Sequence, residues 1–224
     1  KRALKGVSLT LNDGDFVTVI GGNGAGKSTL LNAICGTWRV DEGEIIIGGK
    51  DVTLTAEHKR AKYLGRVFQD PMMGTAADME IQENLALAKR RGKKRGLGWG
   101  ISKNEREEYR ELLATLGLGL EDRMTSKVGL LSGGQRQAVT LLMAAMAEPK
   151  LLLLDEPAAG MNPHETEDLV ETIKFIRDHF DMTILLIEHD MKFVSGLCDE
   201  ITVLNFGTVL AEGDTKTALS DPEV

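Results

Sequence analysis

The chain has 224 residues, enough for one large α/β domain with a smaller insertion but cramped for two independent domains. Hydrophobic residues make up 42% of the sequence and charged residues 27%, a balance that excludes a disordered or fibrous protein. The formal net charge of -7 argues against a nucleic-acid partner, because proteins that bind nucleic acid carry a basic surface that neutralises phosphates.

Short β-type runs recur along the chain, and several are apolar without alternation, which is typical of strands buried on both faces of a parallel sheet. We predict strands at residues 7–11, 16–20, 44–47, 64–68, 151–154, 183–187 and 201–204. A first helix is predicted at 27–35 and a later one at 164–180, where Asn162 is the N-cap and Pro163 occupies the first turn. No apolar stretch approaches the ~18 residues of a membrane span and we find no signal peptide, so we expect any membrane role to come from a partner.

At residues 70–131 the strand-type patterns stop and helical hydrophobic periodicity replaces them, so we predict a separate helical subdomain there. Within it, Ser102 and Glu105 form a capping box. The apolar stripe that follows, ending at Gly117, is formed by Tyr109, Leu112, Leu113 and Leu116. Residues 1–69 and 132–224 are then predicted to form the core of the protein.

A phosphate-binding pattern lies between an apolar predicted strand and a predicted helix, which is where such a pattern functions. Its glycines let backbone N–H groups converge on phosphate oxygens, and the helix directs its partial positive end at them. Lys27 adds a positive charge for the β- and γ-phosphates, and Ser28 offers a hydroxyl to Mg²⁺. A glycine-rich turn that binds nothing is the alternative, but it leaves Lys27 unexplained. We therefore predict a nucleotide-phosphate site at Gly21, Gly22, Asn23, Gly24, Ala25, Gly26, Lys27, Ser28 and Thr29.

Two adjacent acids, Asp155 and Glu156, follow the apolar run at 151–154, at the edge where open α/β sheets bind ligands. Asp155 is suited to hold Mg²⁺ directly or through water, while Glu156 can accept a proton from an attacking water. The alternative is that Glu156 only caps the turn before Pro157. An acid pair beside a phosphate-binding loop has a ready chemical use, so the pair favours hydrolysis.

The pentapeptide Leu-Ser-Gly-Gly-Gln at 131–135 opens another predicted helix, with Ser132 as its N-cap. Its two glycines allow a phosphate to approach the backbone, yet one subunit with one phosphate-binding loop has no need of a second such helix end. With this motif the sequence resembles the ABC ATPase family over essentially the whole chain. The family's motifs stand in order: P-loop, a glutamine after a strand at Gln69, the signature at 131–135, the acid pair, and a histidine ending a strand at His189.

The resemblance implies an α/β fold in which a P-loop NTPase core has a mostly parallel sheet, an antiparallel β part and an inserted α-helical subdomain. It also implies a head-to-tail dimer in which each ATP lies between the P-loop of one subunit and the signature of the other. The signature residues expected to act in trans are Ser132, Gly133, Gly134 and Gln135.

The resemblance assigns catalysis to Glu156, His189 and Gln69, with ATP and Mg²⁺ as cofactors. Gln69 is expected to sense Mg²⁺ and the attacking water, and it completes a metal site with Ser28 and Asp155. His189 is expected to contact the γ-phosphate, although a single histidine after a strand is more often structural.

The sequence departs from the family pattern at two places. Family members have an aromatic residue before the P-loop that stacks on adenine, and we expect that residue to lie upstream of Lys1. The loop after Glu156 commonly ends in aspartate, whereas here it ends in Asn162, which keeps hydrogen bonding but loses a charge. We expect signalling across the dimer to be altered there.

Two parts of the chain resemble different branches of the family. Residues 157–164 and 185–191 resemble ATPases of branched-chain amino-acid importers, while 66–74 and 129–132 resemble ATPases of an aromatic amino-acid uptake group. Both indicate amino-acid import, although this subunit type does not touch the solute.

We therefore predict an ATP-binding and ATP-hydrolysing subunit of an ABC transporter that imports amino acids, at the cytoplasmic face of the cell membrane. Expected partners are transmembrane permease subunits, a second ATPase subunit in a homodimer or heterodimer, and, indirectly, a solute-binding protein, with no nucleic acid. A soluble ABC ATPase without a transport role is the alternative; such proteins show duplicated cassettes, a long coiled coil or a basic surface. A non-catalytic nucleotide-binding regulator is a further alternative, but it would lack Glu156 or His189.

Overall fold

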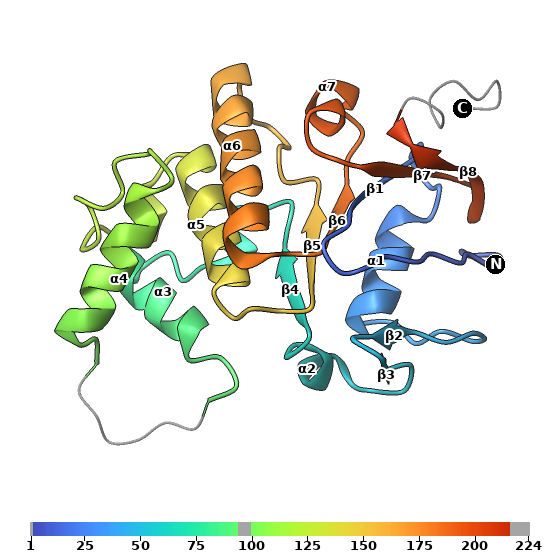
Figure 1. Cartoon of the computed structure of the whole chain (residues 1–224), viewed down its shortest axis with the longest axis horizontal. Helices are drawn as coiled ribbons and strands as arrows, with labels where there is room; N and C mark the ends of the chain where they lie inside the picture. Colours follow the sequence, from blue (N-terminus) through green and yellow to red (C-terminus); the bar gives the residue numbers. More distant parts are fainter. Residues whose placement is uncertain (1, 94–99, 216–224) are drawn as a thin grey trace. The chain divides into compact units, whose positions relative to one another are not determined.

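The computed structural model describes residues 2–93 and 100–215, so parts of the predicted domains, 1, 94–99 and 216–224, lie outside the described residues (Figure 1). The chain divides into two compact units. The first joins Lys1–Arg66, Pro149–Glu156 and Asp181–Val224, and the second joins Val67–Glu148 and Pro157–Phe180. The predicted domains rest on where strand-type sequence patterns give way to helical ones, whereas these two units are defined by compactness. The predicted division, into 1–69 with 132–224 as one domain and 70–131 as the other, therefore stays a prediction.

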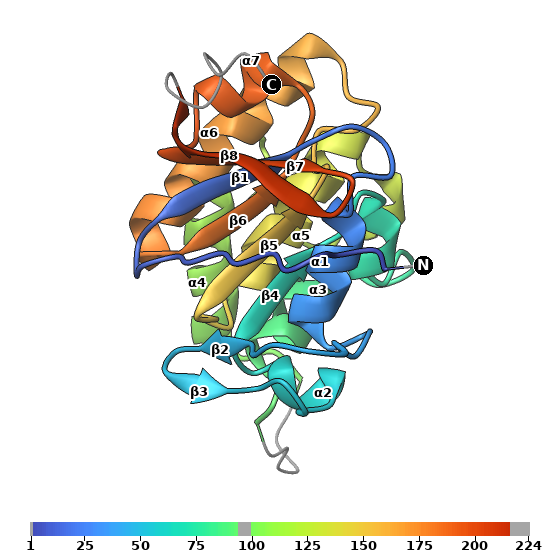
Figure 2. The same cartoon turned by 90° about the vertical axis from the view of Figure 1, so that its right-hand side faces the viewer.

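The main sheet confirms the predicted α/β fold. Among the described residues, a 6-stranded sheet has the order β4-β5-β6-β1-β7-β8 (Figure 2). Its strands are β1 (Phe16–Ile20), β4 (Leu64–Val67), β5 (Leu151–Asp155), β6 (Ile184–Ile187), β7 (Glu200–Asn205) and β8 (Thr208–Asp214). β1 is parallel to β6 and β7, and β5 is parallel to β6, whereas β8 pairs with β7 antiparallel. A small antiparallel hairpin adds β2 (Ile46–Ile47) and β3 (Lys50–Asp51).

The central strand β1 is buried along its whole length, as its unbroken apolar sequence predicts. Its alternate residues Val17 and Val19 pack in a cluster that includes Leu31 of helix α1 (Lys27–Cys35). Ile20 packs in another cluster with Val194 of helix α7 (Met191–Ser195). Packing from both sides holds the carboxyl end of β1, and with it the loop that follows, in a fixed position.

The far end of α1 is anchored by a buried cation that the sequence patterns do not indicate. Arg60, the last residue of helix α2 (Glu57–Arg60), donates to the carbonyls of Ala33 and Ile34 in the last turn of α1, at 2.7 and 2.8 Å. A cation at this position also complements the negative end of the helix dipole. Gly36 leaves room for it, because a Cβ there would lie 2.7 Å from Arg60 Nε.

The second unit is built from helices in its described residues. They are α3 (Ile81–Lys89), α4 (Lys103–Ala114), α5 (Gly133–Ala145) and α6 (Pro163–Phe180), with short 3-10 turns at Pro71–Gly74 and Val128–Leu130. The predicted capping box of Ser102 and Glu105 is present at the start of α4. Tyr109 and Leu113 of the predicted stripe are fully buried, while the helix ends before Gly117.

One strand prediction is wrong. Residues 7–11 form no strand, although Val7, Leu9 and Leu11 still pack against the core cluster beside α1. The alternation therefore reports which side chains face the core, not a ladder of backbone hydrogen bonds. β3, α2, α7 and β8 were not predicted, because the first three are very short and β8 mixes apolar with polar residues. Within residues 2–93 and 100–215, no helix combines the length and apolar character needed to cross a membrane.

Candidate nucleotide-binding and hydrolytic site

The loop between β1 and α1 has the backbone shape of a phosphate cradle. Gly21 and Gly26 both have positive φ, 152° and 111°, in the region that favours glycine. A Cβ on Gly21 would lie 2.3 Å from the carbonyl oxygen of Leu204 in β7. Gly26 is the N-cap residue of α1 and, as a glycine, has no side chain that could cap the helix. The first turn of α1 contains no acidic residue. The partial positive end of α1 is therefore available to an anion.

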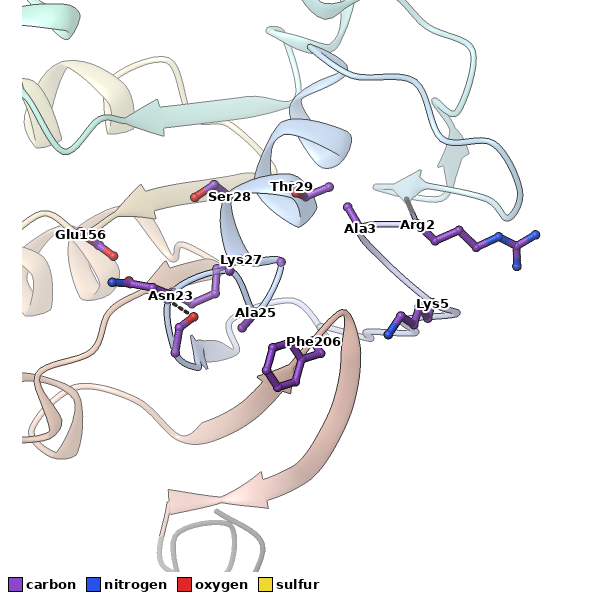
Figure 3. A pocket seen from close by; sticks show the side chains of 13 residues that line it. Arg2, Ala3, Lys5, Asn23, Ala25, Lys27, Ser28, Thr29, Glu156 and Phe206 are labelled. Carbon is purple, nitrogen blue, oxygen red and sulfur yellow. Dashed lines mark hydrogen bonds between the residues drawn. The ribbon is translucent and has the colours of Figure 1, made fainter.

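Lys27 lies inside this loop with only 8% of its surface exposed. Its Nζ donates to the carbonyl of Gly21 at 2.6 Å and to that of Gly22 at 3.4 Å. Figure 3 shows the Lys27 side chain within this loop. A cavity of about 590 Å³, a size typical of small-molecule sites, opens beside the loop. Its lining includes every predicted phosphate-binding residue from 22 to 29 together with Arg2, Ala3, Lys5, Glu156 and Phe206.

The two acids lie where predicted, at the end of β5, but Asp155 has a protein partner that sequence reasoning missed. Arg66 of β4 lies 3.5 Å from Asp155 Oδ2 and also donates to Asn32 Oδ1 of α1 at 3.1 Å. Burial raises the pKa of the Asp155 carboxyl, and the nearby Arg66 guanidinium opposes that rise. An arginine in the otherwise apolar run 64–68 was the available signal.

Glu156 is held in a conformation that few non-glycine residues adopt. Its φ is 44°, and its N–H donates to the carbonyl of Ile187 in β6 at 2.9 Å. Strained backbone of this kind clusters at functional sites, where the surrounding structure enforces it. The consequence here is that the Glu156 side chain lines the cavity beside the phosphate-binding loop.

The structure brings His189 to Glu156. His189 Nδ1 lies 3.8 Å from Glu156 Oε1 and 3.5 Å from Oε2 of Glu188, while most of its ring is exposed. Glu188 is almost fully buried and accepts the N–H groups of His189 and Asp190, at 2.8 and 3.3 Å. Glu188 therefore shapes the turn that carries His189, a role that sequence reasoning missed.

The predicted signature begins helix α5 with its own side chains as caps. Ser132 Oγ accepts the N–H of Gln135 at 3.2 Å, and Gln135 Oε1 accepts the N–H of Ser132 at 3.3 Å. Gln69 belongs to the same compact unit and lies two residues after the end of β4. The carbonyl of neighbouring Phe68 accepts a hydrogen bond from Gln137 Nε2 of α5 at 3.3 Å. The roles of Gln69 and of the signature toward a nucleotide stay predictions.

Comparison with known proteins decides the family. The model of a family described as ABC transporter matches residues 4–159, well over half of the chain. The chain belongs to the ABC transporter family. The matched residues include the P-loop, the signature and the acid pair, so the resemblance and the fold class predicted from the sequence are both confirmed.

Relatives within the ABC transporter family cover nearly the whole chain. The tyrosine transport ATP-binding protein of Clostridioides difficile is 38% identical over 207 residues, which are 92% of this chain and 82% of that protein. The high-affinity branched-chain amino acid transport ATP-binding protein BraF of Pseudomonas aeruginosa is 35% identical over 230 residues, 99% of this chain and 89% of that protein. The dimeric structure of a post-hydrolysis state of the ATP-binding cassette MJ0796, bound to ADP and Pi, has a TM-score of 0.78 and 28% identity, covering 95% of this chain and 90% of that chain.

In this ABC transporter protein, the start of α5 also receives a carboxylate from α6. Glu165 Oε1 accepts the N–H of Gly134 at 3.4 Å, and Glu165 Oε2 accepts from the Asn162 side-chain amide at 2.9 Å. Asn162 Oδ1 in turn accepts the N–H of Glu165 at 3.0 Å, which caps α6. A Cβ on Gly134 would lie 3.1 Å from Glu165 Cγ, so glycine lets this carboxylate approach the helix end. The unusual Asn162 is thus matched to Glu165.

Proposed function

We propose that this chain is the ATP-binding and ATP-hydrolysing subunit of an amino-acid importer, and that its hydrolytic centre is the cavity beside the P-loop. The main support for this proposal is that Glu156 and Lys27 line one cavity and that His189 Nδ1 lies 3.8 Å from Glu156 Oε1. This arrangement combines a cradle for phosphates with a base that can accept a proton at Glu156 Oε1 from an attacking water. The names of the tyrosine and branched-chain amino acid transport relatives support amino acids as the cargo.

The donors around the cavity fit Mg²⁺, which prefers oxygen ligands, takes one or two carboxylates and shares phosphate oxygens with a nucleotide. Ser28 is exposed in the cavity lining, and Asp155 ends the neighbouring strand β5. We assign the ion to these two oxygens. Bound with ATP, Mg²⁺ would neutralise part of the charge on the phosphates. Arg66, 3.5 Å from Asp155, keeps that carboxylate positioned at the strand end.

The proposed assembly is a head-to-tail pair of ATPase subunits in which Ser132 and Gly134 of one subunit face the ATP held by the P-loop of the other. The MJ0796 cassette is dimeric in its ADP- and Pi-bound structure, which supports a dimer. We further assign the pair to transmembrane permease subunits at the cytoplasmic face of the membrane, with a solute-binding protein acting through the permease. The names of the relatives, which are transport ATP-binding proteins, support these partners.

The sharpest test of the hydrolytic centre is Glu156→Gln. General-base assistance is typically worth about 10² to 10⁴ in rate, so the variant should lose roughly that factor in the rate of ATP hydrolysis while ATP affinity changes little. The matched control is Glu171→Gln, which removes an exposed glutamate on α6 that pairs with Lys174. Steady-state hydrolysis and equilibrium binding of ATP measure both quantities. Near-normal turnover in Glu156→Gln would disprove the assignment.

The amino-acid cargo needs a test in cells. In the source organism, deletion of the gene for this chain should abolish uptake of labelled tyrosine or leucine. Expression of the wild-type chain should restore uptake, whereas expression of Glu156→Gln should not. Unchanged uptake of amino acids after the deletion would contradict this part of the proposal without touching the ATPase assignment.

A further inference from the structure

A buried carboxylate follows the end of strand β6. All four residues of β6 are buried, and Glu188, which comes next in the chain, has only 2% of its surface exposed. Moving an unpaired carboxylate from water into such surroundings is strongly unfavourable, so a buried carboxylate is paired or hydrogen-bonded. The proposed hydrolytic step uses Glu156 and His189 but gives this third charged side chain no part in the chemistry.

Three nitrogen atoms surround one oxygen of Glu188. Its Oε2 accepts the backbone N–H groups of His189 and Asp190, at 2.8 and 3.3 Å. His189 Nδ1 lies 3.5 Å from the same oxygen, within the range of an ion pair. Because the two backbone hydrogen bonds and the burial fix the carboxylate, Glu188 is an immobile anchor beside the imidazole.

Glu156 competes for the same ring nitrogen. Glu156 Oε1 lies 3.8 Å from His189 Nδ1, and its side chain is 26% exposed, against 66% for that of His189. Packing therefore contributes little to the orientation of the ring, and attraction to the two carboxylates decides it. The attraction is stronger toward buried Glu188, because protein screens charge less than water does.

We propose that Glu188 is a positioning residue that holds His189 by its Nδ1–H, an inference that rests on the proposed hydrolytic centre. The bond made by one ring nitrogen of a histidine settles which nitrogen carries hydrogen and how the ring is turned. With Nδ1 turned toward Glu188, Nε2 points away from both carboxylates and is the ring atom left for the γ-phosphate. Because a phosphate oxygen accepts a hydrogen bond, the ring then carries hydrogen on both nitrogens, and Glu188 balances its charge. Glu156 keeps its own oxygen open to the attacking water.

The state of the ring is tested without nucleotide, by ¹⁵N NMR of the full chain labelled at its histidines. At mildly alkaline pH, where histidine is neutral, His189 of the wild-type chain should carry hydrogen on Nδ1, whereas a free imidazole side chain prefers it on Nε2. His189→Asn identifies this signal among the four histidines. In Glu188→Gln the hydrogen should move to Nε2, because a neutral amide attracts Nδ1–H less and can itself donate to Nδ1. In Glu156→Gln it should stay on Nδ1.

The effect on hydrolysis is measured as kcat and KM for ATP. Glutamine at position 188 still offers an oxygen to the two backbone N–H groups, so the turn is kept and only the charge is lost. Replacing a charge-assisted hydrogen bond with a neutral one should lower kcat roughly 3- to 10-fold in Glu188→Gln and leave KM unchanged. A collapsed turn would raise KM as well. Asp190→Asn is the matched control and should leave kcat unchanged, because it removes the neighbouring carboxylate while asparagine still caps α7.

Three results would overturn the proposal. Hydrogen on Nε2 of His189 in the wild-type chain would show that Glu188 does not hold the ring. Movement of the hydrogen in Glu156→Gln but not in Glu188→Gln would assign the ring to Glu156. Normal kcat in Glu188→Gln would show that hydrolysis does not depend on this contact. Absence of ATP hydrolysis by the wild-type chain would instead refute the proposed function, and the NMR result would still decide between the two carboxylates.

Discussion

The two glycine-rich helix starts of this protein, at α1 and at α5, look alike in sequence but differ in what occupies them. At α1 no side chain caps the helix within the described residues, and the Lys27 ammonium contacts its own loop carbonyls. At α5 the end is already filled: Ser132 caps it, and the Glu165 carboxylate accepts the N–H of Gly134. Both helix ends carry the same partial positive charge.

In a single chain, the two helix ends therefore differ in how much they gain from binding a phosphate. An uncapped end has unsatisfied N–H groups and gains most from an incoming anion. A capped end is already stabilised by a hydroxyl and a carboxylate, so an incoming phosphate gains less there. We therefore expect the P-loop to supply nucleotide affinity on its own, and the signature to contribute only in the proposed dimer.

Of the two helix ends, the uncapped start of α1 is expected to give the larger effect, in the variant Lys27→Met, which removes the positive charge there. Charge-assisted hydrogen bonds are worth about 1.5–3 kcal/mol, so ATP affinity should fall roughly 10- to 150-fold. Equilibrium titration with the non-hydrolysable ATP analogue measures this directly. Lys174→Met on α6 is the control, because Lys174 is exposed and pairs only weakly with Glu171. A change below about twofold in Lys27→Met would mean that phosphate binding does not depend on this cation.

A smaller effect is expected at the capped end, from Asn162→Asp. Asparagine and aspartate are normally equivalent as N-caps. Here the substitution replaces an amide that donates to Glu165 Oε2 at 2.9 Å with a second carboxylate. Repulsion between the two should lower the free energy of unfolding by about 0.5–1 kcal/mol, measured by urea denaturation at neutral pH.

A variant of Glu165 tests whether this loss of stability comes from repulsion between the two side chains. In the Glu165→Gln background the repulsion is absent, so Asn162→Asp should become nearly neutral, and the double-mutant cycle should yield a coupling of similar size. If Asn162→Asp cost the same stability in both backgrounds, Asn162 and Glu165 would not be a matched pair.

Local signals made the phosphate-binding half of the site predictable. The helix 27–35 was predicted with its observed bounds, because an apolar strand, a glycine-rich turn and a C-terminal glycine all lie within a short stretch of sequence. The capping box at Ser102 and the helix start at Ser132 were predictable for the same reason. Each of these features depends on residues three or four positions apart.

Contacts between distant residues were not predictable. Arg60 contacts α1 from 26 and 27 positions away, Arg66 of β4 pairs with Asp155 of β5, and Gly207 donates a hydrogen bond to Ala25 of the P-loop from far along the chain. Periodicity and propensity report local conformation and burial, so they carry no information about which distant segments meet. The wrong strand at 7–11 has a related cause, because an alternating pattern does not reveal whether a pairing partner exists.

The composite ATP site is tested most directly by measuring ATP hydrolysis with Mg²⁺ across a range of protein concentrations, for the wild-type chain, Glu156→Gln and Ser132→Arg. We expect the rate per subunit to rise with protein concentration, because two half-sites from different subunits must meet. We expect the rate to be lost in Glu156→Gln, which removes the proposed base, and in Ser132→Arg, which obstructs the signature. A rate per subunit that is independent of concentration and survives Ser132→Arg would show that one subunit suffices, and would contradict the composite site.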